Sequence, residues 1–248
     1  MKDAKRIAFF LPNTFTALNM ACGFSSILFS FKGQFYYASM ILLLGAIFDL
    51  VDGRVARLMN AQSTFGEYFD SLSDVVSFGV APAFLMYNSF FKDFGRVGQV
   101  VAFVYLLCGA LRLARFNANI EKVSSNFFQG LPIPMAALAL VGLVLFSEEI
   151  PAIYDYAIFT LVYSSFFALL MISNIPFYSF KDSKWAKAHK KTFLITIFLV
   201  LALLVANEKI MIFATINIYV IGCLIYFLIH RKDFKGYFSW DNEGEDEK

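Results

Sequence analysis

The stretch that decides the fold runs from Asp49 to Asp74 and reads DLVDGRVARLMNAQSTFGEYFDSLSD. It places four aspartates, Asp49, Asp52, Asp70 and Asp74, at the ends of two long apolar segments. A carboxylate near hydrocarbon is costly, at about 2.5–3.5 kcal/mol for Asp at a helix centre on insertion scales. These side chains therefore need a compensating ligand, and a pair of divalent cations is the simplest candidate.

The composition around this stretch is that of a membrane protein. The chain has 248 residues, of which 59% are hydrophobic and only 16% are charged, too apolar for one soluble domain. The 31 phenylalanines suit helices that face lipid. Because the net charge is only +2, the composition indicates no nucleic-acid partner.

The apolar residues fall into eight segments, each about long enough to cross roughly 30 Å of hydrocarbon. No strand-like alternation competes with this pattern, so we predict an all-α, polytopic membrane bundle of about eight transmembrane helices. The first segment lacks a cleavage signal and should be retained. We expect one membrane domain over 1–235 and a disordered acidic tail over 236–248. The expected spans are 12–31, 35–58, 68–90, 98–117, 132–148, 153–175, 192–207 and 210–230.

The distribution of basic residues predicts the orientation of the bundle. With eight spans, 17 of the 21 Lys and Arg residues lie on the side that holds both termini. An excess of Lys and Arg marks the cytoplasmic side, so both termini and the aspartate stretch should be cytoplasmic. The other side has only Lys32, Lys92, Arg96 and Lys209.

Helical spacing brings the aspartates of each segment onto one face. Asp49 and Asp52 are three residues apart, and Asp70 and Asp74 are four residues apart. If the two helices pack side by side, four carboxylates enter one volume. Hard oxygen ligands suit Mg²⁺ or Mn²⁺ rather than Zn²⁺ or Cu²⁺. We therefore predict two divalent cations, the arrangement of two-metal phosphoryl-transfer sites.

The spacing of the small and basic residues resembles a known signature. The pattern D-x2-D-G-x2-A-R-x8-G-x3-D-x3-D is similar to that of the CDP-alcohol phosphatidyltransferase family. The resemblance implies a membrane-embedded enzyme, commonly a homodimer, that transfers a phosphatidyl or similar group from a CDP-linked donor to an alcohol and releases CMP. The matching positions are Asp49, Asp52, Gly53, Ala56, Arg57, Gly66, Asp70 and Asp74.

Four further stretches resemble one branch of this family, the bacterial and archaeal phosphatidylserine synthases. They imply CDP-diacylglycerol as the donor and L-serine as the acceptor. With the orientation predicted from the basic residues, we expect the active site on the cytoplasmic face of the cell (inner) membrane. The motifs cover roughly residues 10–135. The stretches are Pro12–Asn19, Ser71–Pro82, Arg112–Asn117 and Phe128–Pro134.

The resemblance also suggests roles for the acidic residues. Asp49, Asp52 and Asp70 would hold the two metals, and Asp74 would touch metal and take the proton of the serine hydroxyl as general base.

Other residues are candidates for binding the donor. For each Gly or Ala, close helix packing is the alternative. Arg57 could instead be a topological charge, and Asn13 a helix N-cap. The candidates are Gly53, Ala56, Arg57, Gly66, Asn13 and Thr16.

Arg112, Arg115 and Asn117 are candidates for binding the serine carboxylate or a phosphate, because a planar guanidinium suits either group. Positive charges at a helix end are the alternative explanation of the two arginines.

Two other functions remain open at this point. Another family member could use glycerol 3-phosphate or inositol phosphate as acceptor, which should require a more basic pocket. A cation transporter could use carboxylates as its ion site, but it would need charges near the middle of the membrane. The position of Arg54 and Arg57 at one end of a span favours a one-sided enzyme.

Overall fold

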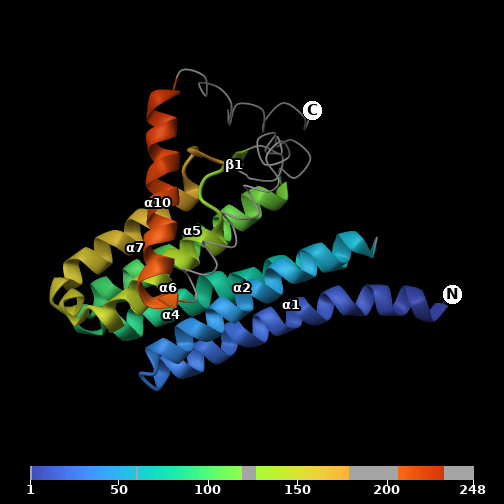
Figure 1. The fold of residues 1–248 in the computed structure, drawn as a ribbon, viewed down its shortest axis with the longest axis horizontal. Helices are drawn as coiled ribbons and strands as arrows, with labels where there is room; N and C mark the ends of the chain where they lie inside the picture. Colours follow the sequence, from blue (N-terminus) through green and yellow to red (C-terminus); the bar gives the residue numbers. More distant parts are fainter. Residues whose placement is uncertain (1, 60, 119–126, 179–205, 232–248) are drawn as a thin grey trace.

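The computed structural model describes residues 2–59, 61–118, 127–178 and 206–231, and nearly all of these residues are helical (Figure 1). The helices are α1 (Lys2–Phe31), α2 (Phe35–Leu58), α3 (Thr64–Asp74), η1 (Val75–Val80), α4 (Ala81–Met86), η2 (Tyr87–Phe91), η3 (Lys92–Phe94), α5 (Arg96–Ala118), α6 (Ile133–Glu149), η4 (Pro151–Tyr156), α7 (Ala157–Ile172) and α10 (Glu208–Ile229).

Within the described residues, five helices are long and apolar enough to span a membrane. The expected spans 132–148 and 153–175 are the shorter helices α6 and α7. Most of 192–207 and all of the tail 236–248 lie outside the described residues. The all-α membrane class is confirmed, whereas the count of eight and the side of the termini stay predictions. The five helices are Phe10–Phe31, Phe35–Leu58, Thr64–Phe94, Arg96–Ala118 and Glu208–Ile229.

Helices α1 and α2 lie side by side along most of their lengths (Figure 1). The tight connection between them uses Gly33, whose φ of 71° favours glycine. Along α1, Gly23 lies against η1, where an added Cβ would be 2.6 Å from Ser77 Oγ. The Ser77 hydroxyl donates to the Asn19 carbonyl at 2.9 Å. Small residues thus let α1 contact both α2 and η1.

The continuous helix from Thr64 to Phe94 contains two π-helical turns, η1 and η2. The first begins directly after Asp74, and such turns often mark functional sites. Pro82 follows in α4 and has no N–H to donate to the Phe78 carbonyl one turn earlier. The buried Tyr105 hydroxyl of α5 donates to that carbonyl at 3.1 Å. A tertiary hydrogen bond therefore supplies a donor to a carbonyl that Pro82 cannot serve.

Helix α6 is the central helix of the core. The consecutive residues 140–144 are all buried, so they cover every side of the helix. Helix α10 approaches α6 closely at Gly142, where an added Cβ would be 3.0 Å from the Phe213 backbone. The rings of Phe146 and Phe213 stack beside this point with centroids 4.6 Å apart.

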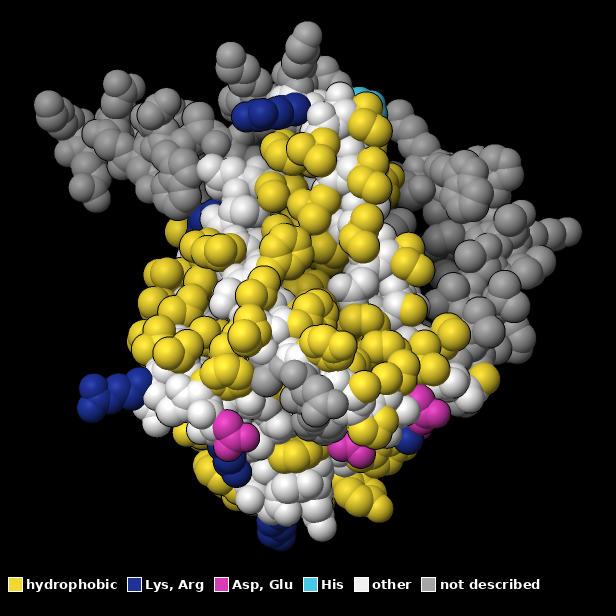
Figure 2. Space-filling view, turned by 90° about the vertical axis from the view of Figure 1, so that its left-hand side faces the viewer, with side chains coloured by type: hydrophobic (Ala, Val, Ile, Leu, Met, Phe, Trp, Pro, Cys, Tyr) yellow, Lys and Arg dark blue, Asp and Glu magenta, His cyan; other side chains and the backbone are white. Residues whose placement is uncertain are grey.

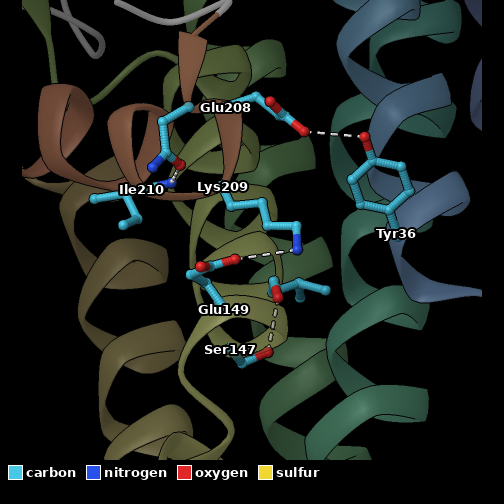
Figure 3. A network of polar contacts seen from close by, with 8 residues as sticks. Tyr36, Ser147, Glu149, Glu208, Lys209 and Ile210 are labelled. Carbon is cyan, nitrogen blue, oxygen red and sulfur yellow. Dashed lines mark hydrogen bonds and ion pairs between the residues drawn. The ribbon is translucent and has the colours of Figure 1, made fainter.

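Polar contacts join the start of α10 to its neighbours (Figure 3). The Tyr36 hydroxyl of α2 donates to Glu208 Oε1 at 3.0 Å. Lys209 Nζ lies 3.1 Å from Glu149 Oε2 at the end of α6. These contacts lie at the end of α2 opposite Asp49 and Asp52.

The outer surface is apolar. Figure 2 shows a face covered mostly by hydrophobic side chains, with the charged side chains of the described residues near its edges. On α10, Ile218, Leu228 and Ile229 are 70%, 68% and 72% exposed. Large exposed apolar areas of this kind are rare on soluble monomers, so this surface fits a lipid environment.

One feature of the fold was not predicted. Strands β1 (Phe127–Gln129) and β2 (Pro176–Tyr178) pair antiparallel, with Phe128 opposite Phe177. The ribbon joins the segment after α5 to the segment after α7. Three-residue strands are too short to produce a recognisable alternation in the sequence.

We predict that Tyr105→Phe will lower the free energy of unfolding by about 1–3 kcal/mol, because it leaves a buried carbonyl without its donor. Thermal unfolding in detergent measures the loss. In the Pro82→Ala background, the restored N–H should make the same substitution less costly. An equal cost in both backgrounds would contradict this explanation.

Candidate active site

Three of the four aspartates converge in the structure. Asp49 is near the C-terminal end of α2, and Asp70 and Asp74 are on α3. One carboxylate oxygen of each residue lies within 4.8 Å of those of the other two. Both helices pack on α1, which directs their acidic faces toward one volume. The structure thus brings together the two segments that the spacing linked.

The carboxylates fit a metal site by their chemistry. Asp70 Oδ1 and Asp74 Oδ1 are buried and have no hydrogen-bond partner among the described residues. A buried polar atom without a partner is rare and costly, and an ion is one explanation. The donor set consists of hard carboxylate oxygens, which are ligands for Mg²⁺ or Mn²⁺. The residues present therefore suit the predicted cofactor.

Asp52 lies beside these three aspartates, and its carboxylate has a hydrogen-bond donor in Thr16. It is buried at 5% exposure, and its Oδ2 accepts a hydrogen bond of 2.7 Å from Thr16 Oγ1. The carbonyl of Thr16 in turn accepts from the Ser73 hydroxyl at 3.1 Å. Thr16 thus connects α1 to both acidic helices and fixes the orientation of the Asp52 carboxylate.

A pocket of about 230 Å³ opens next to Asp52 and Asp70. All six residues predicted to bind the donor line it, so sequence positions from three segments meet there. The sequence did not single out Gln62, Ser63 or Glu67, which also line the pocket and lie in the connection to α3 and its first turn. The shared lining residues are Asn13, Thr16, Gly53, Ala56, Arg57 and Gly66.

The start of α3 explains why the pocket needs Gly66. Ser63 is the N-cap, and its Oγ accepts from the Gly66 N–H at 3.1 Å. An added Cβ on Gly66 would lie 3.2 Å from Ser63 Oγ and 3.5 Å from Asn13 Oδ1. The glycine leaves space between the cap and α1, which a side chain would fill.

Arg112 of α5 is within electrostatic range of the acidic group. It is 7% exposed, its charge interacts with that of Asp74, and its guanidinium lies 5.3 Å from the Phe116 ring centroid. Its Nε has no hydrogen-bond partner among the described residues. A buried arginine with donor capacity to spare is suited to bind an anionic group.

Arg115 and Asn117 point elsewhere. The Arg115 guanidinium donates to main-chain carbonyls that include those of Met171 and Ile172 at the end of α7. Asn117 Nδ2 donates to Ser71 Oγ of α3 at 2.9 Å. Of the three residues predicted for the acceptor, only Arg112 is buried, and its charge interacts with that of Asp74.

The family follows from comparison with known proteins. Residues 9–170, more than half of the chain, match the family model for CDP-alcohol phosphatidyltransferases. The chain belongs to the CDP-alcohol phosphatidyltransferase family. The resemblance predicted from the aspartate spacing is therefore confirmed.

Curated relatives align with most of this phosphatidyltransferase chain. A CDP-diacylglycerol–serine O-phosphatidyltransferase of Helicobacter pylori is 37% identical over 89% of this chain and 92% of its own length. One of Mycobacterium leprae is 32% identical over 90% of this chain and 75% of its own. An archaetidylserine synthase of Methanothermobacter thermautotrophicus is 40% identical over 66% of this chain and 72% of its own.

We predict that Asp49→Asn and Asp70→Asn will each weaken Mn²⁺ binding to this phosphatidyltransferase by at least about tenfold. Loss of an outer partner alone typically costs about 10–100-fold, so loss of a direct ligand should cost no less. Titration followed by electron paramagnetic resonance measures the affinity.

Asp93→Asn makes the same substitution on an exposed side chain of η3 and serves as the control. Unchanged Mn²⁺ affinity in the two aspartate variants, or an equal loss in the control, would contradict the assignment of the metal ligands.

Proposed function

We propose that the protein transfers the phosphatidyl group of CDP-diacylglycerol to the hydroxyl of L-serine, giving phosphatidylserine and CMP. The observation that carries this proposal is the convergence of Asp49, Asp70 and Asp74 beside a pocket lined by the remaining signature residues. The names of the relatives support the acceptor, since those cited above are all serine-using synthases.

The reaction takes place at the cytoplasmic face of the cell membrane, within a single domain of residues 1–235 with about eight spans and both termini in the cytoplasm. The excess of Lys and Arg on one side supports this orientation. A water-soluble amino acid and a lipid-anchored donor can meet only near such a surface. The family resemblance suggests that the enzyme works as a homodimer.

The pocket beside Asp52 binds the CMP half of the donor. Asn13 and Thr16 from α1 and Gly53, Ala56 and Gly66 line its walls. The small side chains allow a flat nucleotide to reach the backbone. Arg57, at the exposed end of α2, supplies positive charge for the phosphates.

Asp74 acts as the general base. It is the most buried of the three converging aspartates, and its charge interacts with that of Arg112. Asp74 takes the proton of the serine hydroxyl, the oxygen attacks the phosphorus that carries the lipid, and the bond to the CMP oxygen breaks. By family analogy the transfer is direct, with no covalent enzyme intermediate.

Asp49, Asp52, Asp70 and Asp74 would together hold two Mg²⁺ or Mn²⁺ ions. When bound, these cations would neutralise charge on the pyrophosphate and on the departing CMP. The hydrogen bond from Thr16 keeps Asp52 turned toward the pocket, where the donor phosphates lie.

Arg112 binds the serine carboxylate. Its burial and its spare Nε donor distinguish it from Arg115, which is occupied by main-chain carbonyls. A planar guanidinium can hold a carboxylate through two parallel hydrogen bonds. This contact would place the serine hydroxyl close to Asp74.

We predict that Asp74→Asn will abolish turnover while CDP-diacylglycerol binding stays largely intact, because an amide cannot accept the hydroxyl proton. CDP-diacylglycerol binding is measured as the protection of the purified protein against thermal unfolding. Turnover is measured as CMP release. Full activity of this variant would rule out Asp74 as the base.

The acceptor is tested with radiolabelled alcohols in one assay. With CDP-diacylglycerol present, labelled L-serine should enter the phospholipid fraction, whereas glycerol 3-phosphate and inositol phosphate should give little product. Preferential transfer to either phosphorylated acceptor would assign the protein to another branch of the family.

A further inference from the structure

Arg115 closes the C-terminal end of α7. Its Nη1 donates to the Ile172 carbonyl at 3.1 Å, and its Nη2 donates to the carbonyls of Gln129 and Met171, each at 3.1 Å, and Ser173 at 3.3 Å. The last carbonyls of a helix lack intrahelical donors and attract positive charge. One guanidinium therefore ties the end of α5 to both α7 and β1.

Gly130 makes this contact possible. Its φ is 71°, and an added Cβ would lie 2.4 Å from the Met171 carbonyl oxygen and 2.9 Å from Arg115 Nη2. Its N–H donates to the Ile175 carbonyl at 3.0 Å. Only glycine fits both the backbone conformation and the space. We call Arg115, Gly130 and the carbonyls of 171–173 the α7 clasp.

The α7 clasp holds the part of α5 that reaches the active site. Arg112 lies one helical turn before Arg115, and Asn117 lies two residues after it. The charge of Arg112 interacts with that of Asp74, and Asn117 donates to Ser71, the neighbour of Asp70. The last turns of α5 are thus fixed on one side to α3 and on the other to α7.

We propose that Arg115 is a positioning residue for the acceptor: through the α7 clasp it sets the place of Arg112 and does not itself touch substrate. The inference rests on the proposed function of Arg112. The proposal gives different roles to the two arginines of one short motif: Arg112 binds the serine carboxylate, and Arg115 holds Arg112 in position. The donor pocket, built from α1, α2 and α3, lies outside the clasp.

The test compares two independent disruptions of the α7 clasp in the full-length protein. Arg115→Met removes the donor group, and Gly130→Ala forces the carbonyls away while Arg115 is retained. Both should raise the KM for serine by about tenfold to a hundredfold, since a shift of about 1 Å can cost roughly 10²-fold. The KM for CDP-diacylglycerol and the Mn²⁺ affinity should stay within about twofold of wild type.

Two further variants separate positioning from general destabilisation. Arg115→Lys keeps the positive charge but loses the planar guanidinium. Its KM for serine should therefore lie between those of wild type and Arg115→Met. Arg96→Met makes the same change as Arg115→Met at the exposed start of α5 and should leave both KM values unchanged.

A wild-type serine KM in Arg115→Met or Arg115→Lys, or an equal rise of both KM values in every clasp variant, would overturn the proposal. If the wild-type protein does not transfer the phosphatidyl group to L-serine, that result overturns the proposed acceptor instead.

Discussion

The structure depends on burying carboxylates at the end of an apolar helical bundle. Asp49, Asp70 and Asp74 approach within 4.8 Å, where like charges without a counter-ion repel each other and lose hydration. The protein offers Arg112 as a neighbouring positive charge and leaves two carboxylate oxygens without a hydrogen-bond partner among the described residues. The surrounding features, including the small residues of α1 and the hydrogen bond from Thr16, keep this costly arrangement in place.

Much of the site could be predicted from the sequence because its residues are close together along the chain. Helical spacing alone groups Asp49 with Asp52 and Asp70 with Asp74, and the signature adds Gly53, Ala56, Arg57 and Gly66. Asn13 and Thr16 were found through a second motif, and they do line the same pocket. The long apolar segments likewise predicted the five long helices, because span length follows directly from bilayer thickness.

What the sequence did not predict depends on contacts between distant segments. Arg115 looks like a second anion-binding arginine until its partners, carbonyls of residues 129 and 171–173, are known. The ribbon of β1 and β2 is too short for a periodic signal. No local sequence pattern predicts the π-helical turn after Asp74 or the hydrogen bond from the Tyr105 hydroxyl to the Phe78 carbonyl.

Whether the aspartates act with bound cations is tested by the metal dependence of CMP release by the purified protein. With CDP-diacylglycerol in mixed micelles, CMP should form only when both L-serine and Mg²⁺ or Mn²⁺ are present, in equal amount to phosphatidylserine. Chelation should stop the reaction and added metal should restore it. CMP release at the same rate in the presence of chelator would show that the aspartates do not act with bound cations.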